Sequence, residues 1–203
     1  MELQKPNVKF FAAGPDRVPL TTFIDLFHSW IQATDGIYYD VADYSHMVAG
    51  PGIVLVAHEA NISIDETEGR RGLLYNRKQP LPGSNRERLN SVFRSALDYC
   101  RRIEEEQSVR GKIKFLGNEA HFLINDRLQA PNAEKTFDAV KSDLEDLART
   151  MYRGAGFTLE HDAQERRKRF SVRLRTPVHF EVEALLNNLN DRAVADTAGR
   201  PAT

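Results

Sequence analysis

The sequence predicts a single α+β domain in which a mostly antiparallel sheet of about nine strands is packed by three main helices. Short apolar runs separated by Gly and Pro indicate the strands, and three longer stretches with apolar residues at helical spacing indicate the helices. The 203 residues include 11 Phe, 6 Tyr and 1 Trp, which is enough aromatic bulk for a core. Residues 1–190 are expected to form the domain, with a possible subdivision near 107–111, and 191–203 a flexible C-terminal tail.

The first half of the chain predicts a strand, a helix and then a run of short strands. Residues 8–12 read as a strand that ends at Gly14-Pro15, and residues 20–32 carry apolar side chains at i, i+3 and i+4. Four strands follow, over 37–43, 53–59, 61–66 and 72–78. In the third of these, Ile alternates with Ser and Asp, which predicts one buried and one solvated face.

From residue 80 onward the sequence predicts two further helices, two more strands and a closing hairpin. A long helix over 85–106 begins after Ser84 and has Glu87 in place for a capping box. The elements expected after it are strands over 112–116 and 120–125, a helix from Pro131-Asn132, a hairpin of 157–161 with 169–175, and a short amphipathic segment over 182–189. The order over residues 8–116 resembles a ferredoxin-like β-α-β-β-α-β unit with an extra hairpin.

Composition excludes several classes of protein. With 28 Lys+Arg against 29 Asp+Glu the formal net charge is −1, so no basic excess supports general nucleic-acid binding. The single cysteine, Cys100, excludes a disulfide-stapled domain. No apolar run approaches the roughly 20 residues of a membrane helix, and the first residues contain no secretory signal, so a cytoplasmic location without membrane contact is expected.

Three stretches carry a family resemblance. Residues 40–46 (DVADYSH), 72–75 (GLLY) and 125–132 (NDRLQAPN) resemble those of a bacterial protein family of unknown function. The resemblance covers most of the chain. It implies no activity, ligand or site, so the candidate sites rest on the residues alone.

The first candidate site combines carboxylates and imidazoles around the predicted strand at 37–43. Asp is disfavoured inside strands, yet Asp40 and Asp43 lie in or at the end of this one. Pleating would place Tyr38, Asp40, Ala42 and Tyr44 on one face, with His46 near it. Pairing with the strand that ends at His58 could then bring the two imidazoles together.

Such a cluster predicts one of two chemistries. Asp40, Asp43, His46 and His58 are candidate ligands for Zn²⁺, Mn²⁺ or Fe²⁺, because neutral imidazole and carboxylate suit those ions. Without a metal, Asp40, His46 and His58 are candidate catalytic acid and base groups. The structural alternative is that Asp40 hydrogen bonds a turn and both histidines are exposed at strand ends. The sequence predicts no cofactor, apart from a divalent metal if this cluster is a metal site.

The second candidate site is cationic. Arg70, Arg71, Tyr75 and Arg77 are candidate ligand-binding residues, because Arg with Tyr commonly holds a carboxylate or phosphate. Tyr75 and Arg77 share one face of a strand, and the two preceding arginines would form the mouth of the pocket. The structural alternative is a salt-bridged hairpin turn with Asp65, Glu66 and Glu68.

Two further segments suggest a turn and a charged patch. Asn125-Asp126-Arg127 is expected to shape the turn after a strand, since Asn and Asp bond their own backbone. Arg166 to Arg169 is a basic cluster that would contact phosphate or an acidic partner, or else form a solvated hairpin tip.

Two functions from different classes remain open. The first is a binding or interaction module without catalytic activity, which self-associates or binds a protein partner through its exposed edge strands. The alternative is a metal-assisted hydrolase or small-molecule lyase that uses the Asp40/Asp43/His46/His58 cluster on an anionic substrate.

Overall fold

The computed structural model describes residues 1–14, 18–163, 165 and 167–198 of the chain. Eight strands and four α-helices are present in this part, together with one short 3₁₀ helix, η1 (Thr67–Gly69). The strands are β1 (Pro6–Ala12), β2 (Tyr38–Tyr44), β3 (Gly52–Ala57), β4 (Ala60–Asp65), β5 (Gly72–Arg77), β6 (Phe115–Ile124), β7 (Thr158–His161) and β8 (Ser171–Arg175). The helices are α1 (Leu20–Ala33), α2 (Asn85–Glu105), α3 (Glu134–Met151) and α4 (Val182–Ala198).

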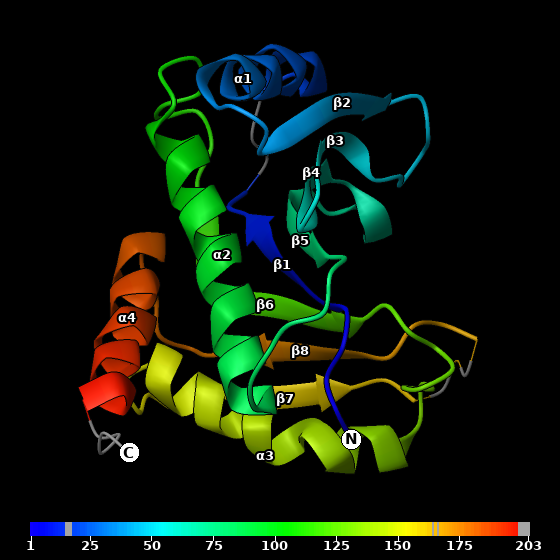
Figure 1. Cartoon of the computed structure of the whole chain (residues 1–203), viewed down its shortest axis with the longest axis vertical. Coiled ribbons are helices and arrows are strands. Elements are labelled where there is room, and N and C mark those ends of the chain that lie inside the picture. Colours follow the sequence, from blue (N-terminus) through cyan, green and yellow to red (C-terminus); the bar gives the residue numbers. More distant parts are fainter. Residues whose placement is uncertain (15–17, 164, 166, 199–203) are drawn as a thin grey trace.

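All eight strands belong to one antiparallel sheet, in the order β2-β3-β4-β5-β1-β6-β8-β7. The predicted α+β class with an antiparallel sheet is therefore confirmed. β1 and β6, one from each half of the chain, pair at the middle of this order, so both halves share a single sheet. Figure 1 shows α1 beside β2 at one end, α2 along the length of the molecule, and α3 and α4 at the end that holds β6, β8 and β7.

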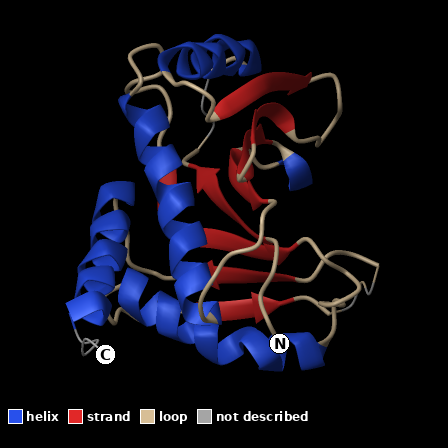
Figure 2. Ribbon diagram, viewed as in Figure 1, coloured by secondary structure: helices blue, strands red, loops and turns tan. Residues whose placement is uncertain are grey.

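The helices pack on one face of the sheet, and the alternation within each strand decides which residues meet them. In β1, Val8 and Phe10 belong to the core, and the Phe10 ring meets Phe93 of α2 edge-on at 6.1 Å. The predicted capping box is present at the start of α2, where the Ser84 and Glu87 side chains each accept from the other's backbone N–H. The opposite face of the sheet carries none of the four α-helices, only the short η1 that Figure 2 draws in blue, and we call it the open face.

Two element predictions were wrong in detail. The two strands expected over 112–116 and 120–125 are one ten-residue strand, β6, so the sheet has eight strands where nine were expected. Gly117 does not turn the chain: a Cβ there would lie 2.0 Å from the Phe180 carbonyl oxygen, so the glycine permits close packing inside the strand. The expected tail at 191–203 is helical as far as Ala198, because α4 runs to that residue, and 199–203 lie outside the described residues.

Two side-chain orientations also differ from expectation. The register of β2 against β3 shifts between Tyr38 and Asp40, so Tyr38 packs under the helices while Asp40, Ala42 and Tyr44 point to the other face. In β4 the predicted solvated face is buried: Ser63 and Asp65 are 4% and 1% exposed. Both faces of this strand are therefore inside the protein, which requires a polar partner for Asp65.

Among the described residues, no helix combines the length and the apolar character that crossing a bilayer requires.

Candidate functional site

The centre of the open face holds a buried ion pair. Lys9 of β1 donates from Nζ to Asp65 Oδ1 at 2.5 Å, and the two residues are 3% and 1% exposed. The same ammonium donates to the carbonyls of Thr67 and Arg70, at 3.1 and 2.6 Å. Burial lowers the pKa of Lys9, and the nearby carboxylate of Asp65 opposes this by favouring the charged form. This pair fixes η1 and its flanking residues over the sheet.

The anchored segment reaches across to the other half of the chain. Arg70 donates two hydrogen bonds to the carboxylate of Glu119 on β6, at 2.9 and 3.0 Å, and its guanidinium lies 3.8 Å from the centroid of the Phe11 ring. Arg173 and Arg175 of β8 donate to the same Glu119 oxygen at 3.3 Å. Burial raises the pKa of Glu119, but the hydrogen bond and charge of Arg70, helped by Arg175, outweigh it and lower the pKa overall.

Two more glutamates, Glu68 and Glu160, complete a charge-balanced network with these arginines. Arg173 also donates to Glu68 at 2.8 Å, and Arg175 to Glu160 at 2.9 Å. Three arginines thus meet three glutamates across β6, β8, β7 and η1. We call this set, with the Lys9–Asp65 pair, the central network.

A cavity of about 500 Å³ opens beside the central network, under the loop that joins β7 to β8. His121 of β6 lines it and stacks on Phe11 with the two ring centroids 6.4 Å apart. Burial lowers the pKa of His121 to about 4. The charge of Glu68 opposes this shift, and the neighbouring cations Arg173 and Lys9 add to it. The imidazole is therefore neutral at pH 7. Within the described residues the ring stacks on Phe11 and makes no hydrogen bond.

The β7–β8 loop also borders a second hollow, of about 440 Å³, and the charged residues among its described lining are all basic. Its lining residues are Asn125, Arg127, Arg167, Lys168 and Arg169, and we call it the basic hollow. Lys168 pairs with Glu165 at 2.7 Å. In the part of the chain that the structure describes, Arg127, Arg167 and Arg169 have no acidic partner. Lys168 and Arg169 also line the cavity that contains His121.

Local structure and strand pairing create the basic hollow. The Asp126 side chain accepts from the backbone N–H of Leu128 and Gln129, which confirms the predicted Asx-type turn after β6. Antiparallel pairing of Leu123 with Ser171 places this turn next to the loop that enters β8. Arg127 then donates from Nη1 to the Arg167 carbonyl at 2.9 Å, which ties the turn to the loop. The predicted cluster member Arg166 lies outside the described residues.

The expected meeting of His46 and His58 was wrong. β2 and β3 pair from Tyr44 opposite Gly52 to Tyr38 opposite Ala57, so His46 lies in the loop at one end of the hairpin and His58 follows β3 at the other. The length of β3 separates these ends by about 17 Å, at about 3.4 Å per residue. The antiparallel register of β2 and β3 sets the separation of the two histidines, and the number of residues between them in the sequence does not reveal that register.

The carboxylates of the same cluster make local hydrogen bonds. Asp40 accepts from the Val41 backbone N–H, and Asp43 from that of Ser45. Hydrogen bonds from the Ser45 side chain and then its backbone lower the pKa of Asp43. His46 lies against Tyr44. No group of three or more His, Cys, Asp or Glu side chains in the described residues has a geometry that would hold a metal ion. A metal or acid–base role for Asp40, Asp43, His46 and His58 gains no support from this arrangement.

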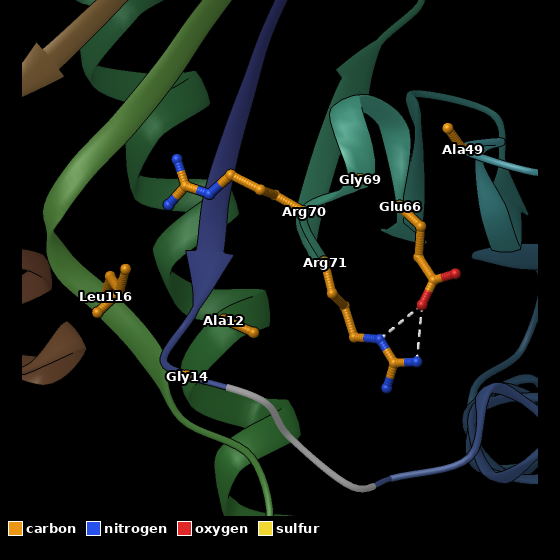
Figure 3. Close-up of a pocket in the computed structure, with 8 residues that line it drawn as sticks. All are labelled: Ala12, Gly14, Ala49, Glu66, Gly69, Arg70, Arg71 and Leu116. Atoms are coloured by element: carbon orange, nitrogen blue, oxygen red, sulfur yellow. Dashed lines mark hydrogen bonds and ion pairs between the residues drawn. The ribbon is translucent and has the colours of Figure 1, made fainter.

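The four predicted ligand-binding residues do not line one pocket. Tyr75 stacks on Tyr99 under α2, and Arg77, at the far end of β5 from Arg70 and Arg71, pairs with Glu59. Arg70 and Arg71 both line a cleft of about 510 Å³, but Figure 3 shows their guanidinium groups pointing apart.

The charged ends of the two cleft arginines are already occupied. Arg71 donates to Glu66 at 2.8 Å and to the Val18 carbonyl at 2.5 Å, and Arg70 is bound to Glu119. Whether these residues bind a ligand stays a prediction, but the cleft offers no free cation from them.

Sequence reasoning identified half of the basic hollow and missed the other half. The basic run at Arg166 to Arg169 is visible in the sequence, whereas the sequence predicts only a turn at Arg127. The missing signal was the antiparallel pairing of β6 with β8, which places residues just after one strand beside residues just before the other. His121 gave no signal at all, because one histidine in an apolar strand has no distinctive spacing.

Comparison with models of known protein families, with curated proteins and with solved structures finds no match to this chain. The resemblance to a bacterial family therefore stays a prediction, and the function must be argued from the side chains.

Proposed function

We propose that the protein is a binding module for a small ligand that carries a phosphate group, with the phosphate held in the basic hollow. One observation carries this proposal: Arg127, Arg167 and Arg169 border one hollow, and within the described residues none of them has an acidic partner. Three like charges that share one hollow repel one another, and a bound anion would remove that cost.

The number of arginines favours phosphate over carboxylate. A guanidinium offers parallel N–H donors that match the oxygens of either group. A phosphate monoester has three strong acceptor oxygens and carries nearly two negative charges at neutral pH, whereas a carboxylate has two oxygens and one charge. Three arginines and a lysine therefore fit a phosphate group better.

The neighbouring cavity supports a ligand larger than phosphate itself. The two hollows share Lys168 and Arg169 as a common wall, and their volumes, about 440 and 500 Å³, lie in the range of small-molecule sites. The second cavity supplies Ser171 and the neutral imidazole of His121 as hydrogen-bonding groups. A polar, uncharged body would fit there while its phosphate contacts the arginines.

Calorimetric titration with pyrophosphate tests the proposal. The intact chain should bind pyrophosphate, and binding should weaken as salt rises, because screening acts on exposed charges. The double variant Arg127→Gln/Arg169→Gln should bind about tenfold or more weakly, since each lost charge-assisted hydrogen bond contributes about 1.5–3 kcal/mol.

The matched control removes two other exposed cations, Arg110→Gln/Lys112→Gln, on the loop after α2. It changes the net charge equally and should bind like the unmodified chain. If both double variants bound pyrophosphate equally weakly, the loss of affinity would be due to net charge alone, and the proposal would be overturned. Equal binding of citrate and pyrophosphate at matched ionic strength would overturn the choice of phosphate.

For the fold, we propose that residues 8–116 and the strands they contribute form a ferredoxin-like unit with an added hairpin. The order β6-β1-β5-β4-β3-β2 supports this, because β1 is flanked by β6 and β5, with β2 at the edge.

A further inference from the structure

The edge strand β2 and its surroundings form a surface that the phosphate site does not involve. β2 is one edge of the sheet and has seven residues, while the other edge, β7, has four. Its backbone pairs with β3 on one side only, among the residues that the structure describes. Proteins commonly protect such an edge with Lys, Pro, a β-bulge or short length. β2 contains neither Lys nor Pro, and its one irregularity lies between Tyr38 and Asp40, so the pairing from Asp40 to Tyr44 is regular.

This edge also concentrates exposed apolar side chains. Of the eight large hydrophobic residues that the structure describes as exposed, five belong to β2 and the segments that flank it. They are Ile37, Tyr39, Tyr44, Met47 and Val48, with exposures from 41% to 99%. A patch of this kind next to unpaired backbone groups is typical of a site for strand addition.

The sequence around the edge carries only negative charge, and the Arg102 guanidinium that reaches β2 from α2 is bound to the hydroxyl of Tyr38. From Val18 to Gly69 the sequence contains eight Asp and Glu and no Lys or Arg. Four of these acids pair with cations from elsewhere in the chain: Glu59 with Arg77, Asp65 with Lys9, Glu66 with Arg71 and Glu68 with Arg173. The other four are on α1, on β2 and between them: Asp25, Asp35, Asp40 and Asp43. All four are exposed, and none pairs with a Lys or Arg in the described part of the chain, although the imidazole of His46 lies near Asp43.

We propose that β2 binds an extended segment of another protein that carries basic and apolar side chains on both of its faces. Its backbone would continue the sheet beyond β2. On the face that Asp40 and Tyr44 share, a cation would meet Asp40 and an apolar side chain would cover Tyr44, and on the opposite face a second cation would meet Asp43. Charge complementarity selects this occupant over a second copy of the chain. Antiparallel pairing of two β2 strands would bring four aspartates together without a cation from either strand.

Synthetic peptides test this surface directly. A peptide that contains Val-Lys-Val-Val-Lys, paired antiparallel to β2, places Lys opposite Asp43 and Asp40 and Val opposite Tyr44, Ala42 and Val41. It should bind and protect the backbone amides of β2 from hydrogen exchange, measured by NMR. The matching Val-Glu peptide should not bind. A Val-Lys peptide N-methylated at alternate nitrogens should lose binding too, because it cannot complete the ladder of hydrogen bonds.

Charge variants assign the contact to β2. Asp40→Asn/Asp43→Asn should weaken the Val-Lys peptide on the order of tenfold at low salt, as expected from two opposite-charge pairs across strands. The control Asp138→Asn/Glu183→Gln removes two exposed acids from α3 and α4 and should leave binding unchanged.

Three results would overturn the inference. They are peptide-induced shifts that map away from β2, equal loss of affinity in both double variants, and a dimer, seen by ultracentrifugation, whose formation protects β2 in place of the peptide. The last result would make a second copy the occupant.

Discussion

The centre of the open face and its two ends use charge in different ways. At the centre, Lys9 and Asp65 are buried and paired, and Arg70 is bound by both of its terminal nitrogens to Glu119. At the β7–β8 end, arginines such as Arg169 line a hollow without an acidic partner in the described residues, and at the β2 end aspartates are equally unpaired. Paired charge holds loops onto the sheet, whereas unpaired charge remains available for a partner. A near-zero net charge conceals this separation.

The largest effect should come from breaking the buried pair. Lys9→Met leaves Asp65 charged and buried, and it releases the carbonyls that hold η1. We expect a loss of about 3–5 kcal/mol in the free energy of unfolding, measured with denaturant. The double variant Lys9→Met/Asp65→Leu should recover much of this loss, because no charge then remains buried. A loss below about 1 kcal/mol in the single variant would show that the centre is not held by this pair.

The second effect is the pH dependence of stability that the neutral His121 produces. This residue lines the cavity between the central network and the β7–β8 loop. Its pKa falls from 6.5 to about 4 on folding, so between these values the unfolded chain binds a proton that the folded chain does not. Stability should therefore fall as the pH drops from 6.5 to 4, with His121 contributing about 3 kcal/mol of the fall. Urea unfolding across this range should show a shallower fall for His121→Gln. Parallel curves for the two proteins would contradict the burial of a neutral imidazole.

The third effect tests whether Glu119 joins the two halves of the network. Glu119→Gln should cost about 1–3 kcal/mol at neutral pH, because Arg70 loses a charged acceptor. The folded pKa of Glu119 lies below its ordinary 4.5, so its stabilising contribution is present above that value and is lost as the pH falls through the folded pKa. Thermal unfolding of variant and unmodified chain should therefore converge in acid, and a constant difference would point to lost packing.

The smallest expected effect is a gain in stability, whereas the variants at the centre of the open face should lose stability. This difference in sign distinguishes the β7–β8 end from the centre. Arg169→Gln should raise stability by about 0.3–0.5 kcal/mol at low salt, since it removes repulsion within the basic hollow, and the gain should vanish at high salt. Arg110→Gln, an exposed cation outside the hollow, should give no gain. A destabilising Arg169→Gln would mean that this arginine has a structural partner and belongs with the central network.

Local patterns in the sequence were enough to predict the helices and most strands. The face of α2 and its capping box follow from residues within one or two turns, and both are present. The strand break near Gly117 was predicted wrongly because a glycine in a strand also serves close packing, here against Phe180, which is distant in sequence. His46 and His58 were separated by a register that the spacing of two histidines does not specify.

The candidate site was only partly predictable for the same reason. The run of basic residues before β8 is visible in the sequence, but the basic hollow needs Arg127 as well, and that meeting depends on β6 pairing with β8. The buried Asp65 illustrates the limit of alternation: its partner, Lys9, is 56 residues away. Charges paired across strands are invisible to local patterns, so an apparently solvated face can be an internal one.

The most direct test of the phosphate site follows the side-chain Nε–H signals of the arginines by NMR during a titration with pyrophosphate. The signals of Arg127, Arg167 and Arg169 should shift together with a single dissociation constant, and that of Arg77, at the far end of β5 and paired with Glu59, should stay in place. Shifts spread evenly over arginines across the whole surface, or none at the basic hollow, would contradict the account.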